Sequence, residues 1–293
     1  MIDPVIFRIH IGSFSLALHW YGIFVMLGVV TGGYVASQGL RRRGENPDLV
    51  WDALIWLLPA GVIGARLWYV ANATLGGNLY YMQNPLQIIN IPAGGLHFFG
   101  GLLFGLVALI AYMRKQNADL WLFLDSIAPA LLVGQAVARP ANFINQELYG
   151  QPTTLPWGIP IDAAHRLAIF SDLAKYPVET TRFHPTFAYE IIWNLLTFAL
   201  IYALLNKGKL ATTPGATFGM WLMAAGFGRT WIEFFRPDQP IIAGGWLTTS
   251  MAVSFLMGLA GVLLFLVSTK KLTLGKLHLP EGYVISEQDL TEK

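Results

Sequence analysis

The sequence has no cysteine, and charged residues make up only 12% of its 293 residues. The missing cysteines exclude disulfide bonds, thiolate metal ligands and a cysteine nucleophile supplied by this chain. The low charge argues against a water-soluble globule, because an average soluble domain carries about 25% charged residues. The net charge of +2 is too small to indicate a nucleic-acid-binding surface, and the six histidines show no zinc-binding spacing.

Hydrophobic residues, by contrast, make up 55% of the chain. A helix that crosses a bilayer needs about 20 mostly apolar residues, and seven stretches meet this requirement. They lie near 14–38, 50–73, 96–113, 120–138, 187–206, 215–235 and 246–268. The sequence therefore predicts an all-α polytopic membrane protein, with seven transmembrane helices and a small periplasmic cap.

Basic residues predict the orientation of these helices. They follow the first, third, fifth and seventh stretches, which places them all on one side of the membrane. They are Arg41, Arg42 and Arg43, then Arg114 and Lys115, then Lys207 and Lys209, and finally Lys270 and Lys271. Because basic loops stay in the cytoplasm, the N-terminus is expected outside and the C-terminus in the cytoplasm.

The chain divides into a predicted seven-helix membrane domain, 1–276, and a polar cytoplasmic tail, 277–293. The membrane domain includes an outer cap segment at about 139–186, whose prolines exclude one long helix. A short helix is expected near 162–174 within the cap, and residues 1–13 resemble a short interfacial segment. The tail is expected to be disordered or loosely docked.

Several charged residues interrupt the apolar stretches. A charge at the bilayer centre costs about 2.5–3.5 kcal/mol on insertion scales, so it usually faces a cavity or a partner. Arg66 lies in the second stretch and Asp125 in the fourth. Arg229 and Glu233 share one helix face in the sixth, which Arg236 ends. The plainer interpretation of Arg229 and Glu233 is an intrahelical ion pair that only stabilises the fold.

A dense polar segment runs from Arg139 to Gly150. Arg139, Asn142 and Asn145 recur every third residue and would line one side of a helical turn. An arginine with two carboxamides is suited to the oxygens of phosphate and glycerol. A polar helix end that satisfies its own backbone is an equally good interpretation of the spacing.

Other polar residues allow two interpretations each. Thr186 could cap the fifth helix, with Glu190 in its first turn, and His184 just before it is a possible proton acceptor. A lone histidine among aromatics, such as His97, is more often interfacial than catalytic. Tyr21 is most simply a residue of the aromatic belt at the membrane surface. Together the residues indicate an outward-facing, arginine-rich cavity suited to an anionic phospholipid.

At these residues the sequence resembles the prolipoprotein diacylglyceryl transferase family of bacterial inner-membrane enzymes. The most specific block runs from Arg139 to Gly150 and contains Asn-Phe-Ile-Asn and Glu-Leu-Tyr-Gly. Four further blocks occur in the order the family has them. They are His19-Trp20-Tyr21-Gly22, Gly64-Ala65-Arg66, His184-Pro185-Thr186 with Tyr189-Glu190, and Gly228-Arg229 with Glu233-Phe234-Phe235-Arg236. The resemblance covers about 14 to 268.

The resemblance implies that the chain moves a diacylglyceryl group from phosphatidylglycerol to the lipobox cysteine thiol in the signal peptide of a prolipoprotein. This reaction forms a thioether and releases glycerol phosphate, as the first step of bacterial lipoprotein maturation. It implies a multi-pass protein of the bacterial cytoplasmic (inner) membrane in contact with membrane lipid, with no cofactor, metal or nucleic acid. The substrate then supplies the cysteine that this chain lacks.

The resemblance also assigns roles to residues. Arg139 and Arg229 are expected to bind phosphate and stabilise the leaving group, with Glu233 orienting Arg229 or contacting the lipid glycerol. The expected catalytic residues are Arg139, Arg229, Glu233 and His97. The residues expected to bind phosphatidylglycerol are Arg139, Asn142, Asn145, Glu147, Gly150, Tyr21, Arg66, His184, Tyr189, Glu190 and Arg236, with Glu147 structuring its loop.

Two positions depart from the family pattern. The family commonly has histidine directly before the paired glycines of the third span, but here Phe99 precedes Gly100 and Gly101. His97 lies two residues earlier, which places it on another face if the segment is helical and on the same side if it is extended. In addition, Ala138 and Pro140 flank Arg139 where a glycine and an aliphatic residue are commoner.

These departures leave other functions open. Phe99 suggests a catalytically silent relative that binds anionic phospholipid or a lipoprotein precursor. The charges within the membrane alone would also suit a transporter of an anionic lipid or metabolite. The absence of a convincing internal sequence repeat counts against a transporter.

Overall fold

The computed structural model describes residues 3–11, 14–91, 94–206, 209–237, 242, 245, 247–273 and 279–284. The chain forms two compact units. The first consists of Met1–Gly39 with Leu124–Tyr283, and the second of Leu40–Phe123 with Val284–Lys293. The predicted basic residue Lys207 and most of the predicted tail lie outside the described residues.

The described residues are mostly helical, and six of the helices they form are long and apolar enough to cross a membrane. They are α1 (Trp20–Arg42), α2 (Asp48–Leu75), α4 (Phe98–Lys115), α5 (Leu120–Ala138) with its continuation α6 (Pro140–Ile144), α7 (Thr186–Leu205) and α9 (Thr249–Ser268). The prediction of membrane-spanning helices is confirmed for these six. The remaining predicted stretch also forms a helix, α8 (Ala216–Glu233), but this helix, which contains Arg229 and Glu233, is not among the six.

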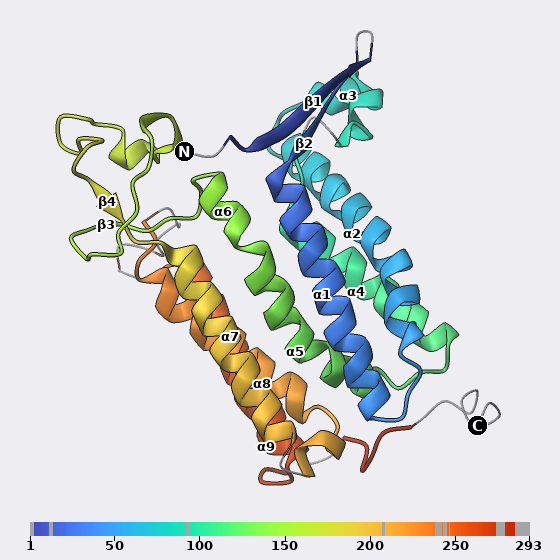
Figure 1. Ribbon diagram of the computed structural model, residues 1–293. Coiled ribbons are helices and arrows are strands. Elements are labelled where there is room, and N and C mark those ends of the chain that lie inside the picture. Colours follow the sequence, from blue (N-terminus) through green and yellow to red (C-terminus); the bar gives the residue numbers. More distant parts are fainter. Residues whose placement is uncertain are drawn as a thin grey trace. The chain divides into compact units, whose positions relative to one another are not determined.

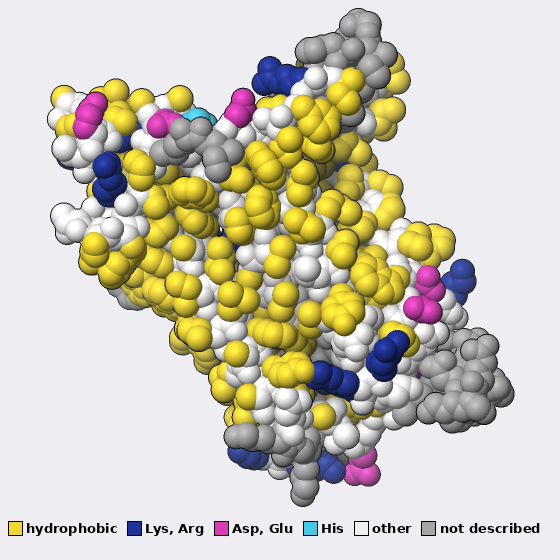
Figure 2. All heavy atoms as spheres, viewed as in Figure 1, with side chains coloured by type: hydrophobic (Ala, Val, Ile, Leu, Met, Phe, Trp, Pro, Cys, Tyr) yellow, Lys and Arg dark blue, Asp and Glu magenta, His cyan; other side chains and the backbone are white. Residues whose placement is uncertain are grey.

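In the first unit, α7, α8 and α9 lie side by side (Figure 1). Glycines bring α8 and α9 into close contact, since a Cβ atom on Gly226 would lie 2.3 Å from the backbone nitrogen of Gly258. Such small-residue packing is typical of helices in lipid, where no hydrophobic effect drives helices together. Hydrophobic side chains cover the visible flank of α7 in Figure 2. Leu196 and Leu200 of this helix are at least 60% exposed.

The N-terminal segment is a hairpin of β1 (Val5–Ile11) and β2 (Phe14–His19). The strands pair antiparallel, with Phe7 opposite Leu18. The prediction that the first helix begins near residue 14 is therefore wrong, because the apolar residues before Trp20 pair as a strand. The helix then continues past the predicted end, to Arg42.

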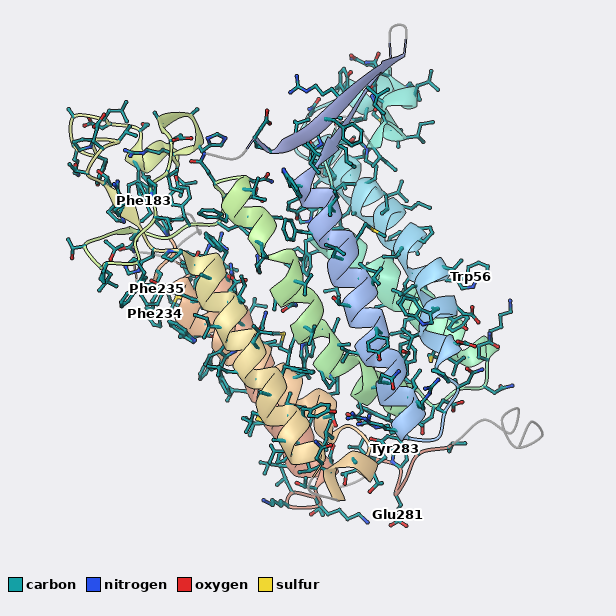
Figure 3. All side chains as sticks on the ribbon, viewed as in Figure 1. Trp56, Phe183, Phe234, Phe235, Glu281 and Tyr283 are labelled. Carbon is teal, nitrogen blue, oxygen red and sulfur yellow. The ribbon has the colours of Figure 1, made fainter. Side chains whose placement is uncertain are left out.

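The segment 148–183, here called the cap, has its own small core of Tyr149, Ile161, Phe170 and Phe183. Two short strands, β3 (Pro152–Thr153) and β4 (Arg182–Phe183), pair antiparallel within it. Figure 3 labels Phe183, which is completely buried at the centre of this core.

The predicted helix over 162–174 is wrong, because the cap has two separate 3₁₀ turns there. These are η3 (Ala163–His165) and η4 (Ala168–Phe170). Arg166 and Leu167 between them have extended backbones, with ψ near 140° and 148°. The backbone N–H of Leu167 donates to the Tyr149 hydroxyl at 2.5 Å, and Arg166 Nε donates to the Ile161 carbonyl at 3.1 Å. These two contacts hold the chain out of a continuous helix.

At the other end of the first unit, Asp125 caps α8. Its carboxylate accepts hydrogen bonds of 2.6 Å from the backbone N–H groups of Gly215 and Phe218. The hydroxyl of Tyr283 donates to the same carboxylate at 2.8 Å (Figure 3). The intramembrane charge of Asp125 thus serves as a helix cap, and the described part of the tail docks on it.

In the second unit, α2 packs against α4 at Gly64 and Gly100. A Cβ atom on Gly100 would lie 2.3 Å from the Gly64 carbonyl oxygen. The connection between these helices contains α3 (Tyr80–Gln83) and the 3₁₀ helix η1 (Pro85–Ile88). In the first unit, the 3₁₀ helix η5 (Lys209–Thr212) follows α7 in the chain.

Candidate active site

The polar segment that begins at Arg139 lies where α5 ends and α6 begins. Arg139 keeps a helical backbone, and its N–H still donates to the Gln135 carbonyl at 3.1 Å. Pro140 is the first residue of α6, a position where the missing N–H of proline costs little. The unusual proline is therefore accommodated without moving Arg139 off the helix.

Glu147 organises the turn that follows. Its Oε1 accepts hydrogen bonds from Asn142 Nδ2 at 2.8 Å and from Asn145 Nδ2 at 3.3 Å. Asn142 Oδ1 in turn accepts a hydrogen bond from Arg139 Nη1 at 3.3 Å. Both carboxamides thus direct their N–H groups at Glu147, which holds the turn closed beside Arg139.

Glu190 on α7 joins two arginines that are 90 residues apart in the sequence. Its Oε2 is paired with Arg139 Nη2, and its Oε1 with Arg229 Nη1 at 3.0 Å. The side chains of Arg139 and Arg229 are about a quarter exposed, whereas that of Glu190 is only 10% exposed. The fold therefore brings the two predicted phosphate-binding arginines onto one carboxylate, which we call the Arg–Glu–Arg cluster.

Glu233 supports this cluster from within α8. It forms the predicted intrahelical pair with Arg229, at 3.0 Å between Nη2 and Oε2, and its side chain is fully buried. Its other oxygen accepts a hydrogen bond of 3.4 Å from Thr248 just before α9. The ion pair of Arg229 with Glu233 is only part of its environment, since Arg229 also contacts Glu190. Arg236, just beyond the helix, is buried as well.

A hydrogen-bonded chain of aromatic residues lies next to the cluster along α7. Trp157 Nε1 of the cap donates to the Tyr189 hydroxyl at 2.8 Å, and this hydroxyl lies 2.9 Å from His184 Nδ1. The His184 ring also packs against Phe235, labelled in Figure 3, at 4.9 Å between ring centroids. Burial lowers the pKa of His184 below its ordinary value of 6.5, so the imidazole is neutral near pH 7.

Thr186 does not cap α7, and that interpretation is wrong. Pro185 occupies the N-cap position, and the Thr186 hydroxyl donates to the Leu148 carbonyl. Gly150 lies where the chain passes close to two neighbours, since a Cβ atom there would be 2.5 Å from the Phe235 carbonyl oxygen and 2.9 Å from His184 Cβ. Thr186 and Gly150 therefore fix the path of the chain between the Glu147 turn and α7.

In the second unit, the guanidinium group of Arg66 donates hydrogen bonds to backbone carbonyls. Its Nε donates to Ile88 at 2.8 Å and its Nη1 to Gly94 and Gly95 at 2.5 and 3.1 Å, while Nη2 donates to Gln87. The predicted lipid-binding arginine thus holds the loop before α4 in place. Most of its donors are already used there.

His97 lies immediately before α4 in an extended conformation, at the N-cap position. Its ring packs against Trp68 at 6.4 Å and Phe99 at 5.7 Å between centroids. Its Nδ1 is buried and has no hydrogen-bond partner among the residues that the structure describes. Phe99 is already helical, so the extended alternative holds for His97 only. Tyr21, in the first turn of α1, is 46% exposed.

Comparison with known proteins gives the family. The family described as prolipoprotein diacylglyceryl transferase matches residues 4–267. The chain belongs to this family. Three relatives carry the name phosphatidylglycerol–prolipoprotein diacylglyceryl transferase. The protein of Bifidobacterium longum subsp. infantis is 36% identical, over 90% of this chain and 84% of its own. That of Chloroflexus aggregans is 34% identical over 90% of both chains, and that of Synechocystis is 37% identical over 92% and 91%.

Sequence reasoning missed several residues that shape this diacylglyceryl transferase site. Trp157 reaches Tyr189 from the cap, and Gln146 is joined to Asp162 by two hydrogen bonds of 2.7 Å. Gln146 also has a positive φ of 51°, which is uncommon for a residue with a side chain. The contact of Gln146 with Asp162 spans 16 residues and that of Trp157 with Tyr189 spans 32, so neither leaves a local pattern in the sequence. The one local signal is the position of Trp157 between two prolines of the cap.

Proposed function

We propose that this chain transfers the diacylglyceryl group of phosphatidylglycerol to the lipobox cysteine thiol of prolipoproteins. Its relatives are named for phosphatidylglycerol and prolipoprotein. The observation that carries the proposal is the Arg–Glu–Arg cluster, which gathers cationic groups at the cap end of α5, α7 and α8. Arginine forks are the groups best suited to a phosphate diester.

The reaction forms a carbon–sulfur bond and breaks a carbon–oxygen bond. The thiol loses its proton, and the thiolate attacks the glyceryl carbon that carries the phosphate. The bonding electrons leave with the ester oxygen, so glycerol phosphate departs with the negative charge. The product is a thioether, and no step requires an oxidant or a reductant.

Arg139 and Arg229 would bind the phosphate and stabilise the charge that develops as it leaves. Each guanidinium is partly exposed, so an anion can reach it from outside the protein. Glu233 would orient Arg229, since its buried carboxylate holds one side of the guanidinium. Asn142, Asn145 and Glu147 would keep Arg139 in position through the closed turn, next to Gly150 and the buried Arg236.

Two histidines are candidates for the group that takes the thiol proton. His184 is neutral near pH 7 and is oriented by Tyr189, which makes it a competent base. His97 has a buried ring nitrogen without a partner among the described residues. Arg66 and Tyr21 would contribute to lipid binding, Arg66 through the loop that it holds.

The membrane arrangement follows from the same sequence features. We infer that α8 is the seventh span and that the cap lies in the periplasm, with the N-terminus outside. The loops after α1 and α4 carry the basic residues and would face the cytoplasm, together with the tail after 276. The protein would then be a multi-pass protein of the bacterial inner membrane, with 1–276 as its membrane domain.

The signal peptide of a prolipoprotein would approach from the membrane and present its lipobox cysteine to the cluster. The test is transfer from fluorescent phosphatidylglycerol to a lipobox peptide by purified protein, with the Cys→Ser peptide as control. We expect mild alkali to release the two ester-linked acyl chains of the product but to leave the glyceryl group on the cysteine, because a thioether does not hydrolyse as an ester does. A folded protein that yields no such product would refute the proposal.

A catalytically silent relative is the second candidate, and Phe99 favours it. Such a protein would bind anionic phospholipid or a lipoprotein precursor without turnover. Phosphatidylglycerol would then raise its melting temperature more than phosphatidylethanolamine does, although no product forms.

A further inference from the structure

Glu190 occupies the position that a phosphate diester would take between the two arginines. One of its oxygens faces Arg139 and the other faces Arg229. A phosphate diester likewise has two free oxygens, and guanidinium groups bind carboxylate and phosphate with the same fork geometry. An incoming phosphate therefore meets arginines that already hold an anion.

The other carboxylate of the cluster is held differently. Glu233 is fully buried, pairs with Arg229 inside one helix and is fixed by Thr248. Glu190 is the carboxylate that connects arginines from two separate elements, and both arginines reach the surface beside it. Of the two, Glu190 is the one whose partners an external anion could take over.

We propose that Glu190 is an internal competitor for the phosphate of the lipid headgroup. In the empty site it neutralises Arg139 and Arg229. When phosphatidylglycerol binds, its phosphate takes over the arginine N–H groups, and Glu190 returns to them as glycerol phosphate leaves. This inference rests on the proposed function. It gives Glu190 a role in substrate binding and product release, in addition to pairing with the two arginines.

Competition by Glu190 would speed the release of glycerol phosphate from the two arginines. The phosphate diester of the substrate carries one negative charge, whereas a phosphate monoester carries about −1.5 to −2 at pH 7. Two arginines without a competitor would hold the released monoester more tightly than the substrate. A carboxylate that repels the bound anion and reclaims the arginines offsets this difference.

The test replaces the charge of Glu190 and keeps its shape, with Glu190→Gln. Glycerol phosphate is added both to the transferase assay, as product inhibitor, and to the protein in detergent, where its binding is read from the melting temperature. We expect the inhibition constant of glycerol phosphate and the KM for phosphatidylglycerol to fall about tenfold, while kcat also falls. Glu179→Gln is the matched control, because Glu179 lies exposed on the cap and forms none of the ion pairs that the structure describes. It should change neither constant.

The opposite result is equally clear. If Glu190→Gln melts like the wild type but binds glycerol phosphate equally or more weakly, Glu190 only positions the arginines and the competition is refuted. If Glu190→Gln is unstable, Glu190→Met tests the same point, since it also keeps the length of the side chain without its charge and should also tighten binding. Because binding is measured without turnover, tighter binding in a chain that makes no product would uphold the competition and refute only the proposed transferase.

Discussion

At the scale of single residues, the arginines of this chain differ in what they are free to do. Arg66 spends its donors on backbone carbonyls, whereas Arg139 and Arg229 are paired with carboxylates and remain about a quarter exposed. The sequence could not distinguish them, because Arg66 and Arg229 both interrupt apolar stretches and Arg139 directly follows one. The distinction depends on carbonyl groups such as those of Ile88 and Gly94, which bind Arg66, and on Glu190, which binds the other two arginines. These partners lie more than 20 residues from the arginines in the sequence.

Arg229→Lys tests whether the fork geometry matters. A lysine keeps the charge but contacts only one anion at a time, whereas Arg229 joins Glu190 and Glu233 simultaneously. We expect kcat/KM to fall by about 10²–10³-fold, the loss typical of removing one transition-state donor. Arg182→Lys in the cap is the control and should retain wild-type activity. Full activity of Arg229→Lys would show that charge alone is sufficient.

His184 predicts a dependence of stability on pH. Its pKa is lowered in the folded state by burial, so the unfolded chain binds the proton more readily than the folded one. The stability due to the neutral ring is complete above pH 6.5 and is lost as the pH falls below it. We expect the melting temperature to fall between pH 7.5 and 5.5, and His184→Gln to reduce that fall. His165→Gln, at an exposed site, should leave it unchanged; an equal reduction there would contradict the assignment.

At the scale of elements, long apolar helices could be predicted well and irregular segments poorly. The spans at α2, α5 and α7 follow from length and composition. The start of α1 was misplaced because a strand with the same apolar residues precedes Trp20. The helix predicted over 162–174 of the cap is wrong, because the backbone there is fixed by a small core and by contacts such as that of Leu167 with Tyr149. These contacts override the local preference for a helix.

The packing of α8 on α9 positions Arg229, and it depends on glycine. A Cβ atom on Gly226 would lie 2.3 Å from Gly258 N, so Gly226→Ala forces the helices apart. We expect a loss of about 1–3 kcal/mol in stability, typical of overpacking, seen as a lower melting temperature in detergent. Gly105→Ala has nothing within 4 Å of its new Cβ atom and should be at least as stable as the wild type. Equal stability of the two variants would refute the close packing.

At the scale of the whole molecule, the sequence predicts how the chain lies in the membrane. The described helices supply six spans on composition alone, and α8 is the proposed seventh. An odd number of spans places the two termini on opposite sides. The basic residues then choose the side, because they gather in alternate loops.

The lack of cysteine makes this topology easy to test, since any cysteine introduced is unique. Ala174→Cys in the cap should react with a membrane-impermeant maleimide in spheroplasts. Lys115→Cys, at the end of α4, should react only after the membrane is made permeable. Labelling of both from the same side would contradict the seven-span arrangement.

The most direct test of the central claim is the transferase assay on wild type and Arg139→Ala, with His97→Ala beside them. We predict a thioether product from phosphatidylglycerol with the wild type and a loss of at least about a hundredfold with Arg139→Ala, because Arg139 holds the leaving phosphate. Loss of activity in His97→Ala as well would make that histidine catalytic. A wild-type protein that binds phosphatidylglycerol but transfers nothing would contradict the proposed transferase activity and identify a binding protein with the fold of a transferase.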